Sequence, residues 1–597
     1  MKKEKTVSLC MIVKNEEKYL PTCLNSVKEL VDEMIIIDTG SKDNTVNIAK
    51  DFGAKIHYYE WDNNFSNARN YSLQFATKEW ILLMDADDEF NKDDSDKFIR
   101  LINNSTKDGH YFKTLSYAGE YKGDNIVYNL NLRLLRNTKK YSYIGAIHEQ
   151  ITCNESPIDY SNFSPEEIRI FHYGYLNNVA LEKNKRQRNI SIINEELKQD
   201  QSNPFHIFNL GNEYFALGEK EKALELYNSA YKNLDFNIGF SSKLVFKRIM
   251  CFYELGQFGD ALHAIGEGLN IYPKFTDLEF NRGCIHLKNK RYTLALDSFN
   301  KCLELGPSPT GLEFLDGCGT YRPNEALGKL YYELNDYQKA FIYYQNALKD
   351  NSNSPRLIYK IGNILNKIYE DKKFVSYKLS QYFNINHLPN LLLLSDILLF
   401  EGLYHSALGY LEKAKDLDEN NIQIKYLTAQ AFFYTKNYSE AQNLFEQLPV
   451  NSLEYQESIK YLFICSLINN QKNIDLLFNN IESNFDQLII KVYRQLLSIY
   501  LGNNETLFSE VDNYEKITEL VMTILNEPLK IHEFILFEKL INILNKIDSN
   551  KVLLKLAKIY SDNNFKQIAA KEVLRSIKEL NTIDPEGVKI LYEEFCF

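Results

Sequence analysis

The sequence predicts an α/β domain built on a doubly wound sheet, followed by an all-α region of helical repeats. Up to residue 175, short apolar segments alternate with helical segments. This order is typical of a mostly parallel sheet with helices on both faces. Beyond residue 201, small and aromatic residues recur at a regular spacing, which is typical of stacked helix pairs. The length of 597 residues is enough for two or more domains.

Buried strands and amphipathic helices alternate in the first part of the α/β domain. We expect strands at Val7–Val13, Met34–Ile37, Ala54–Tyr59 and Trp80–Met84, and helices at Lys18–Val31, Asp43–Phe52 and Ser66–Ala76. The residues Asp43-Asn44-Thr45 can cap the second helix. This part therefore predicts a parallel core of four strands.

The pattern changes in the second part of the α/β domain. From Tyr111 to Ile151, apolar and polar residues alternate without a long helix, which predicts antiparallel strands beside the parallel core. A last strand is expected at Ile168–His172, and Leu176–Gln199 reads as a long charged helix that leaves the domain.

The remainder of the chain repeats a helix-pair pattern. Ala261 and Ala295 are 34 residues apart, as are Ala407 and Ala441, and this is the period of tetratricopeptide repeats. The repeats are weak between residues 450 and 550, where we expect only packed helices. The predicted divisions are an α/β domain at 1–178, a linking helix at 179–200, tetratricopeptide repeats at 201–350 and divergent helical repeats at 351–597.

Composition excludes several classes of protein. An apolar fraction of 44% with 13% aromatic residues is typical of a folded chain, and the net charge of −11 argues against broad nucleic-acid binding. Nine scattered cysteines without a CxxC pair indicate reduced thiols. No apolar run approaches the roughly 18 to 20 residues that span a bilayer. We therefore expect a cytoplasmic protein without a transmembrane segment.

The cluster Asp85-Ala86-Asp87-Asp88-Glu89 directly follows the fourth expected strand. Ligands of open α/β sheets bind at the carboxyl ends of the strands. Carboxylates this close oppose one another's ionisation unless a positive charge lies among them. A hard divalent cation, Mg or Mn, would supply that charge and could carry a phosphate compound. The cluster predicts a metal–phosphate site.

Two further segments lie at the same edge of the expected sheet. Asp38 ends the second strand, where its carboxylate could accept hydrogen bonds from a ribose or a base. The loop after the first strand, Lys14-Asn15-Glu16-Glu17, lacks GxGxxG, which disfavours dinucleotide binding of the oxidoreductase type. Arg69, in the first turns of the third helix, could pair with carboxylates or phosphate.

The last candidate functional residues lie in two histidine motifs and on a basic helix. His148-Glu149 and His172 lie near expected strand ends. His172 could ligate the metal and Glu149 could act as general base, and these roles could also be exchanged. The exit helix carries basic residues that are either a solvated face or groups that neutralise a departing diphosphate: Lys183, Lys185, Arg186 and Arg188.

Together these motifs resemble family 2 glycosyltransferases of the GT-A fold. The matching segments are residues 7–17 (VSLCMIVKNEE), 36–45 (IIDTGSKDNT), 65–70 (FSNARN) and 83–88 (LMDADD). The segments GAIHE at 145–149 and HYGY at 172–175, followed by tetratricopeptide repeats, are similar to a subgroup that includes glycocin S-glycosyltransferases and flagellin-modifying transferases.

The resemblance implies a UDP-sugar donor, UDP-glucose or UDP-N-acetylglucosamine, and transfer with inversion by direct displacement. It implies that Asp38 holds the nucleoside, and that Asp85 and Asp87 hold the metal and diphosphate, with Mn or Mg as the metal. Lys14, Glu16 and Arg69 are the further candidates for nucleotide-sugar binding. The family motifs do not fix the base, because no clear Glu-Asp pair occurs between residues 110 and 175. Glu149, with His148 beside it, is therefore the catalytic candidate.

We expect the acceptor to be a protein or peptide side chain, flagellin-like or a small peptide, bound by the repeats. One alternative is the same chemistry on a lipid-linked or cell-surface glycan. Another is a non-catalytic repeat scaffold that only senses nucleotide sugar. The sequence leaves the oligomeric state open.

Overall fold

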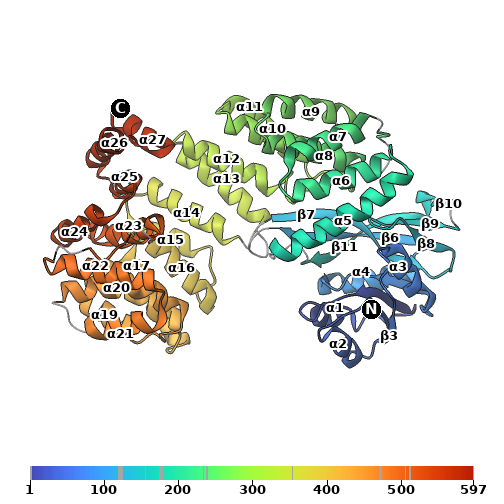
Figure 1. Ribbon diagram of the computed structural model, residues 1–597, viewed down its shortest axis with the longest axis horizontal. Helices are drawn as coiled ribbons and strands as arrows, with labels where there is room; N and C mark the ends of the chain where they lie inside the picture. The colour runs from blue at the N-terminus through green and yellow to red at the C-terminus, as the bar shows by residue number, and fades with distance from the viewer. Residues whose placement is uncertain are drawn as a thin grey trace. The chain divides into compact units, whose positions relative to one another are not determined.

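The computed structural model of the chain divides into two compact units, Met1–Asn353 and Ser354–Phe597. It describes residues 3–118, 125–154, 156–173, 179–232, 234–236, 239–351, 354–469, 474–503, 506–509 and 512–595. The first unit holds a sheet and the helices up to α13, and the second is helical (Figure 1). The predicted division at residue 178 lies outside the described residues, and the four predicted domain ranges stay predictions.

Four parallel strands form one half of an eight-stranded sheet. They are β1 (Val7–Val13), β2 (Glu33–Asp38), β3 (Lys55–Tyr58) and β4 (Trp80–Leu83), in the order β3-β2-β1-β4. β1 and β4 are apolar and buried along almost their whole length, as expected for central strands covered on both faces. The predicted parallel core is confirmed.

Helices cover the two faces of this half, and the alternation of side chains in β1 shows how. Leu9 and Met11 pack in one core with α1 (Leu20–Val27), α2 (Thr45–Asp51) and α4 (Ser95–Asn104). Cys10 packs in the other core with α3 (Phe65–Gln74). Successive side chains of a strand point to opposite faces, so an unbroken apolar strand requires cover on both sides. The expected doubly wound arrangement is present.

The other half of the sheet continues in the order β7-β6-β11-β5. The strands are β7 (Asn125–Arg136), β6 (Gly109–Ala118), β11 (Phe163–His172) and β5 (Asp88–Phe90). Antiparallel pairing was expected here and holds for β4–β7, β6–β7 and β11–β5, whereas β11 and β6 are parallel. A small second sheet contains β8 (Tyr141–Ile144), β9 (Gln150–Cys153) and β10 (Ser156–Pro157). Two 3-10 turns, η1 (Lys92–Asp94) and η2 (Tyr160–Asn162), lie between these elements.

Helix pairs follow the sheet within the first unit. They are preceded by α5 (Val179–Gln199) and comprise α6 (Pro204–Ala216), α7 (Lys220–Lys232), α8 (Ser241–Glu254), α9 (Phe258–Ile271), α10 (Thr276–Lys288), α11 (Tyr292–Leu305), α12 (Tyr321–Glu333) and α13 (Tyr337–Asp350). A Cβ on Gly211 would lie 2.7 Å from the ring of Tyr227, and one on Gly283 would lie 2.6 Å from the ring of Phe299. Glycine is thus required where the partner helix inserts an aromatic ring, which confirms the interlock that the repeat spacing predicts.

The repeats of the first unit contact the sheet directly. The hydroxyl of Tyr128 on β7 donates to Asp316, in the segment between α11 and α12, over 2.6 Å. Lys113 on β6 forms an ion pair of 3.2 Å with Glu313 in the same segment. The repeats therefore add to the core of the first unit instead of following it as a separate tail.

The second unit consists of helices only among its described residues. They are α14 (Pro355–Ile368), α15 (Lys372–Ser380), α16 (Leu388–Phe400), α17 (Tyr404–Leu417), α18 (Ile422–Tyr434), α19 (Tyr438–Glu446), α20 (Leu453–Ile468), α21 (Ile474–Asn484), α22 (Gln487–Tyr500), α23 (Tyr514–Lys530), α24 (Phe534–Leu540), η3 (Ile541–Lys546), α25 (Val552–Asp562), α26 (Lys566–Leu580) and α27 (Pro585–Phe595). The repeat alanines Ala407 and Ala441 are fully buried. The expectation of packed helices between residues 450 and 550 is confirmed for the described residues.

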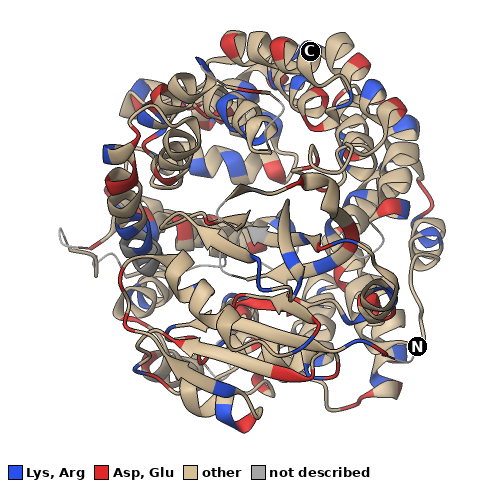
Figure 2. Cartoon of the chain, turned by 90° about the vertical axis from the view of Figure 1, so that its right-hand side faces the viewer, with Lys and Arg blue, Asp and Glu red and all other residues tan. Residues whose placement is uncertain are grey.

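The described residues also show how charge is distributed along the helices and whether any helix could span a membrane. Basic and acidic residues are interspersed along the helices (Figure 2), and the net charge is −11. Within the described ranges, no helix has the length and apolar character needed to cross a membrane.

The cysteines in these ranges are all free thiols.

Candidate active site

The candidate site lies where the parallel strands end. Asp38, the last residue of β2, is 4% exposed. Its carboxylate accepts hydrogen bonds from the backbone N–H groups of Gly40 at 3.2 Å and Ser41 at 3.1 Å. Gly40 has a φ of 104°, a conformation that favours glycine. The turn thus holds the carboxylate of Asp38 at the edge of the sheet where we expect the ligand.

The acidic segment after β4 forms a tight turn. The N–H of Asp85 donates to the carboxylate of Asp88 over 2.8 Å, and the N–H of Asp88 donates to the carbonyl of Asp85 over 3.1 Å. β5 then pairs with β11, which places His172 opposite Asp88. Pairing between strands that are distant in sequence therefore brings the predicted histidine to the predicted acidic cluster.

Arg69 on α3 joins two of the predicted residues. Its Nη2 lies 2.8 Å from Oδ1 of Asp85, and its Nε lies 3.0 Å from Oε1 of Glu149. Burial alone would raise the pKa of Asp85, but the guanidinium groups of Arg69 and Arg133 outweigh it and hold that pKa well below its usual value. Asp85 is therefore an ionised carboxylate fixed by cations of the protein.

Arg133 is the residue of this cluster that the sequence analysis missed. On β6, His110 pairs with Leu134 and Tyr111 pairs with Leu132, so Arg133 is the extra residue of a β-bulge in β7. Its Nη1 lies 2.9 Å from Asp88 and 3.3 Å from Asp85. Bulges next to functional sites re-aim a side chain. In the sequence, Arg133 follows Asn129 and Asn131 at the polar positions of an alternating segment, so nothing there distinguished it from a solvent-facing residue.

Among the residues that the structure describes, Asp87, Asp88 and His172 form the group that could hold a metal ion, with one ligand atom from each within 4.8 Å of the others. Nδ1 of His172 lies 3.0 Å from Asp88 and 3.5 Å from Asp87. The predicted ligand set contained Asp85 in place of Asp88. The structure groups Asp88 with the histidine, because Asp85 is turned toward the two arginines.

Within this group, Asp87 and His172 fit a metal best. Asp88 is 1% exposed and already pairs with Arg133, whereas the side chains of Asp87 and His172 are 18% and 17% exposed. Burial raises the pKa of Asp87, and the neighbouring carboxylates add to the rise while His172 opposes it. A carboxylate whose charge is disfavoured in this way gains from a bound cation.

Glu16, in the loop after β1, belongs electrostatically to the same cluster. Burial and the carboxylate of Asp87 raise the pKa of Glu16 to about 7, while Lys185 on α5 opposes the rise. Lys14 lies exposed at the end of β1, two residues before Glu16. The first strand thus adds a carboxyl group and a cation at the predicted edge, and the exit helix adds Lys185.

The two candidates of the GAIHE segment point to different places. We call residues 145–149 the histidine loop. Glu149 faces Arg69 and the acidic cluster, with a side chain that is 15% exposed. Nε2 of His148 instead lies 3.9 Å from Glu213 on α6. The structure therefore brings Glu149, and not His148, to the cluster.

Tyr173 and Glu213 are further residues that the sequence analysis did not single out. The hydroxyl of Tyr173 donates to Glu89, and its N–H donates to the carbonyl of Asp87 over 3.0 Å. Glu213 is 1% exposed within the first repeat. The HYGY pattern pointed to its histidine only, and an isolated glutamate in a helix gives no signal of burial.

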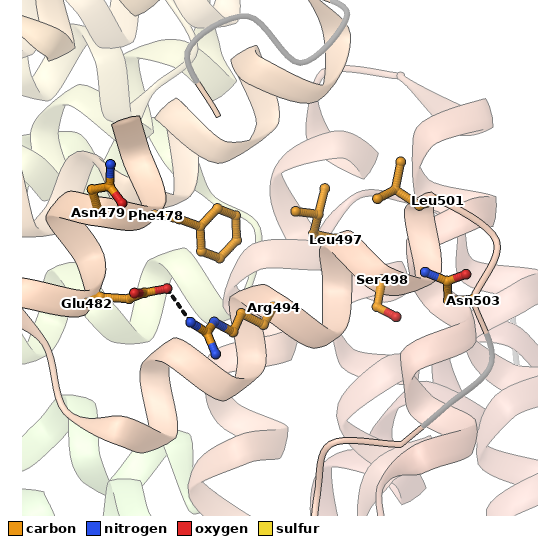
Figure 3. A pocket seen from close by; sticks show the side chains of 8 residues that line it. All are labelled: Phe478, Asn479, Glu482, Arg494, Leu497, Ser498, Leu501 and Asn503. Carbon is orange, nitrogen blue, oxygen red and sulfur yellow. Dashed lines mark hydrogen bonds and ion pairs between the residues drawn. The ribbon is translucent and has the colours of Figure 1, made fainter. Parts of the chain in front are cut away.

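A pocket of about 420 Å³ lies between α21 and α22 in the second unit (Figure 3). Its lining residues are Phe478, Asn479, Glu482, Arg494, Leu497, Ser498, Leu501 and Asn503. The two charged side chains, Glu482 and Arg494, pair with each other.

Fold and site together define an α/β domain that presents carboxylates and arginines at its strand ends, joined to helical repeats. Comparison with known proteins shows which families these two parts of the chain match. Residues 8–156 match glycosyl transferase family 2, and residues 207–233, 280–309 and 321–351 match the tetratricopeptide repeat. The chain thus carries an N-terminal family 2 glycosyltransferase domain and tetratricopeptide repeats after it, as the sequence motifs predicted.

Several individual proteins are similar to parts of this chain. The glycosyltransferase SunS of Bacillus subtilis, described as derived from the SPbeta prophage, is 32% identical over 234 residues, which are 38% of this chain and 54% of SunS. An uncharacterized glycosyltransferase of Rickettsia bellii is 27% identical over 32% of this chain and 73% of its own length. A TPR repeat-containing protein of Synechococcus elongatus is 54% identical over 14% of this chain and 21% of its own length. The chain spans about half the length of SunS.

Solved structures resemble the chain only distantly. A tetratricopeptide repeat protein from Parabacteroides merdae is 16% identical and covers 42% of this chain and 94% of its own, with a TM-score of 0.27. At this TM-score the likeness carries no argument about function.

Proposed function

We propose that this protein is an inverting glycosyltransferase that moves a hexose or N-acetylhexosamine from a UDP-sugar to a protein or peptide side chain. The observation that carries the proposal is the position of Arg69, which joins Asp85 to Glu149 at the carboxyl end of β4. Together with the family 2 match over residues 8–156, this contact supports Glu149 as a base beside the proposed donor site.

The donor would lie along the edge formed by the ends of β1, β2 and β4. Asp38 would accept hydrogen bonds from the nucleoside. Asp85 and Arg69 would contact the sugar diphosphate. Lys14 and Glu16 would lie beside the donor at the end of β1. A guanidinium group suits this position because it binds phosphate oxygens through two parallel hydrogen bonds.

A divalent metal, Mn or Mg, would be held by Asp87 and His172. When bound, it would stabilise the negative charge that develops on the departing diphosphate. The raised pKa of Asp87 supports this assignment, because burial and the carboxylates of Asp85 and Asp88 outweigh the positive charge nearby. Lys185, which lowers the pKa of Asp87 and Glu16, adds positive charge from α5.

Glu149 would act as the general base. Its Oε1 pairs with Arg69, and Oε2 would take the proton from the hydroxyl or thiol of the acceptor. The freed oxygen or sulfur would form a bond to the anomeric carbon while the bond from that carbon to the diphosphate oxygen breaks. Attack on the face opposite the leaving group inverts the anomeric centre.

The repeats would bind the acceptor. Repeats that match the tetratricopeptide family begin at residue 207, after α5, and stacked repeats form extended surfaces suited to peptides. We also propose that the reaction takes place in the cytoplasm, because scattered free cysteines fit a reducing compartment.

A donor and acceptor screen tests the proposal. Purified protein is incubated with a panel of UDP-sugars and Mn²⁺, and released UDP is measured with and without a chelator. Intact masses of candidate protein acceptors are then compared before and after reaction, with lipid-linked glycans in parallel. We expect metal-dependent UDP release and a mass increase of one hexose or N-acetylhexosamine on a protein. Transfer to the glycan only, or no UDP release from any donor, would contradict the proposal.

A further inference from the structure

The histidine loop is held by elements from both parts of the first unit. The Oγ of Ser66 donates to the carbonyl of Gly145 over 2.6 Å, and the N–H of Phe65 donates to the carbonyl of Ala146 over 2.8 Å. On the opposite side, the N–H of Ala146 donates to Glu196 of α5 over 2.8 Å. The loop is thus clamped between α3 of the transferase domain and the helix that leads to the repeats.

An apolar contact continues this attachment into the first repeat. Ile147, which is 6% exposed, packs in a cluster with Ile193 of α5 and Leu210 of α6. α5 and α6 lie against each other (Figure 1). The loop therefore packs against a surface that the transferase domain alone does not supply.

The next residue, His148, has a strained backbone. Its φ is 55°, a left-handed conformation that costs on the order of 1–3 kcal/mol in a residue other than glycine. Such a conformation persists where its surroundings fix it from several sides. Nε2 of His148 is buried and lies 3.9 Å from Oε1 of Glu213 on α6, beyond hydrogen-bond distance.

Glu213 is itself held firmly. It is 1% exposed, its Oε2 lies 3.1 Å from Nη1 of Arg186, and its Oε1 accepts a hydrogen bond of 3.0 Å from Asn189. Both partners belong to α5, whereas Glu213 belongs to the first repeat. Glu213 therefore ties α6 to α5 through a buried ion pair and a hydrogen bond at the level of the histidine loop.

We propose that Glu213 of the first repeat is a positioning residue for the transferase, holding the histidine loop so that Glu149 faces Arg69 and the acidic cluster. This inference rests on the proposed function, because it concerns the placement of the proposed base. The first repeat is then part of the active-site support as well as part of an acceptor surface. Glu213 touches neither donor nor metal and acts through the loop.

The test compares two variants of the full-length protein. Glu213→Gln keeps the side-chain shape but removes the negative charge that pairs with Arg186. The paired variant Glu213→Leu/Arg186→Met replaces the buried ion pair by apolar groups, which commonly preserves stability. Amide hydrogen exchange of residues 145–149, UDP binding and UDP-sugar hydrolysis are measured for each, with melting temperature as the check on folding.

We expect exchange in the histidine loop to become about 10-fold faster in both variants, since α5, which holds the loop through Glu196, is no longer tied to α6 by the buried ion pair. We expect the kcat of hydrolysis to fall about 10- to 100-fold, the scale of a catalytic group displaced by about 1 Å. UDP affinity should stay unchanged. Glu527→Gln is the matched control, because Glu527 is another buried helix glutamate paired with a cation, Lys460, in the second unit.

A paired variant with wild-type loop exchange and wild-type kcat would overturn the proposal. Equal loss of kcat in Glu527→Gln would also overturn it, because the effect would then follow from any buried charge. If the wild-type protein hydrolyses no UDP-sugar, the proposed function fails, while the exchange measurement still decides whether Glu213 holds the loop.

Discussion

The guanidinium group of Arg133 lies 2.9 Å from the buried carboxylate of Asp88. This pair joins β7 to the turn that follows β4, and it exists because the bulge places an extra residue on β7. The side chains of Arg133 and Asp88 are 6% and 0% exposed. Removing one member of such a pair leaves an uncompensated buried charge.

We therefore predict that Arg133→Met lowers the free energy of unfolding by about 3–5 kcal/mol. Chemical denaturation of the full-length protein measures this change. The double variant Arg133→Met/Asp88→Asn should recover part of the loss, because it also removes the opposing charge. A single variant as stable as the wild type would show that the ion pair does not stabilise the site.

Asp87→Asn is predicted to abolish UDP-sugar hydrolysis and transfer while the protein stays folded. The fold should tolerate the change because the surroundings of Asp87 raise its pKa and thus disfavour its negative charge. Calorimetric titration with Mn²⁺ should show a lost or strongly weakened site. Asp93→Asn, at an exposed carboxylate of η1, is the matched control. Normal turnover in Asp87→Asn would contradict the metal assignment.

Glu149→Gln is predicted to lower the rate of the chemical step about 10²- to 10⁴-fold, the usual contribution of a general base. Donor affinity should remain nearly intact, because the amide can still accept a hydrogen bond from Arg69. Single-turnover kinetics measure the rate, and titration with UDP-sugar measures the affinity. Loss of donor binding would assign Glu149 to the donor site in place of the base role.

The raised pKa of Glu16 predicts a pH-dependent stability. The pKa rises from 4.5 to about 7 through burial and the carboxylate of Asp87. The folded protein therefore binds this proton more tightly than the unfolded chain, so the free energy of unfolding falls as pH rises from about 4.5 to 7. Allowing for the part of the carboxyl group that faces solvent, the cost at pH 8 is on the order of 1–2 kcal/mol.

Glu16→Gln removes this cost, so without metal the variant should be more stable than the wild type at pH 8 and equally stable at pH 4. Thermal melts in a chelator at both pH values measure the difference. Glu29→Gln, at an exposed carboxylate, should show no such pH dependence. Equal melting temperatures of Glu16→Gln and wild type at pH 8 would contradict the electrostatic role of Glu16.

The sequence was sufficient for the strands of the parallel core and for the repeats, because both leave local patterns. A buried strand such as β4 requires an apolar run, and the close approach of Gly283 to Phe299 requires a small residue at a fixed spacing from an aromatic one. The acidic cluster was also predictable, because it directly follows such a strand.

The features that could not be predicted from the sequence depend on contacts between segments that are distant along the chain. The parallel pairing of β11 with β6 cannot be inferred from alternation within either strand. The bulge at Arg133 is a property of two strands together. His148 and Glu149 are adjacent in sequence, yet only the packing of the histidine loop against α6 determines which of them faces the cluster.

Gly283→Ala and Gly266→Ala should change stability in opposite directions, although both place a methyl group on a repeat helix. A Cβ on Gly283 would lie 2.6 Å from the ring of Phe299, whereas one on Gly266 would meet nothing within 4 Å. Phe299 is fully buried and cannot move aside, so overpacking should cost about 1–3 kcal/mol. Gly266→Ala should instead gain about 0.5–1 kcal/mol from helix propensity. Chemical denaturation measures both changes, and equal stability of Gly283→Ala and wild type would show that the ring of Phe299 does not set the distance between α10 and α11.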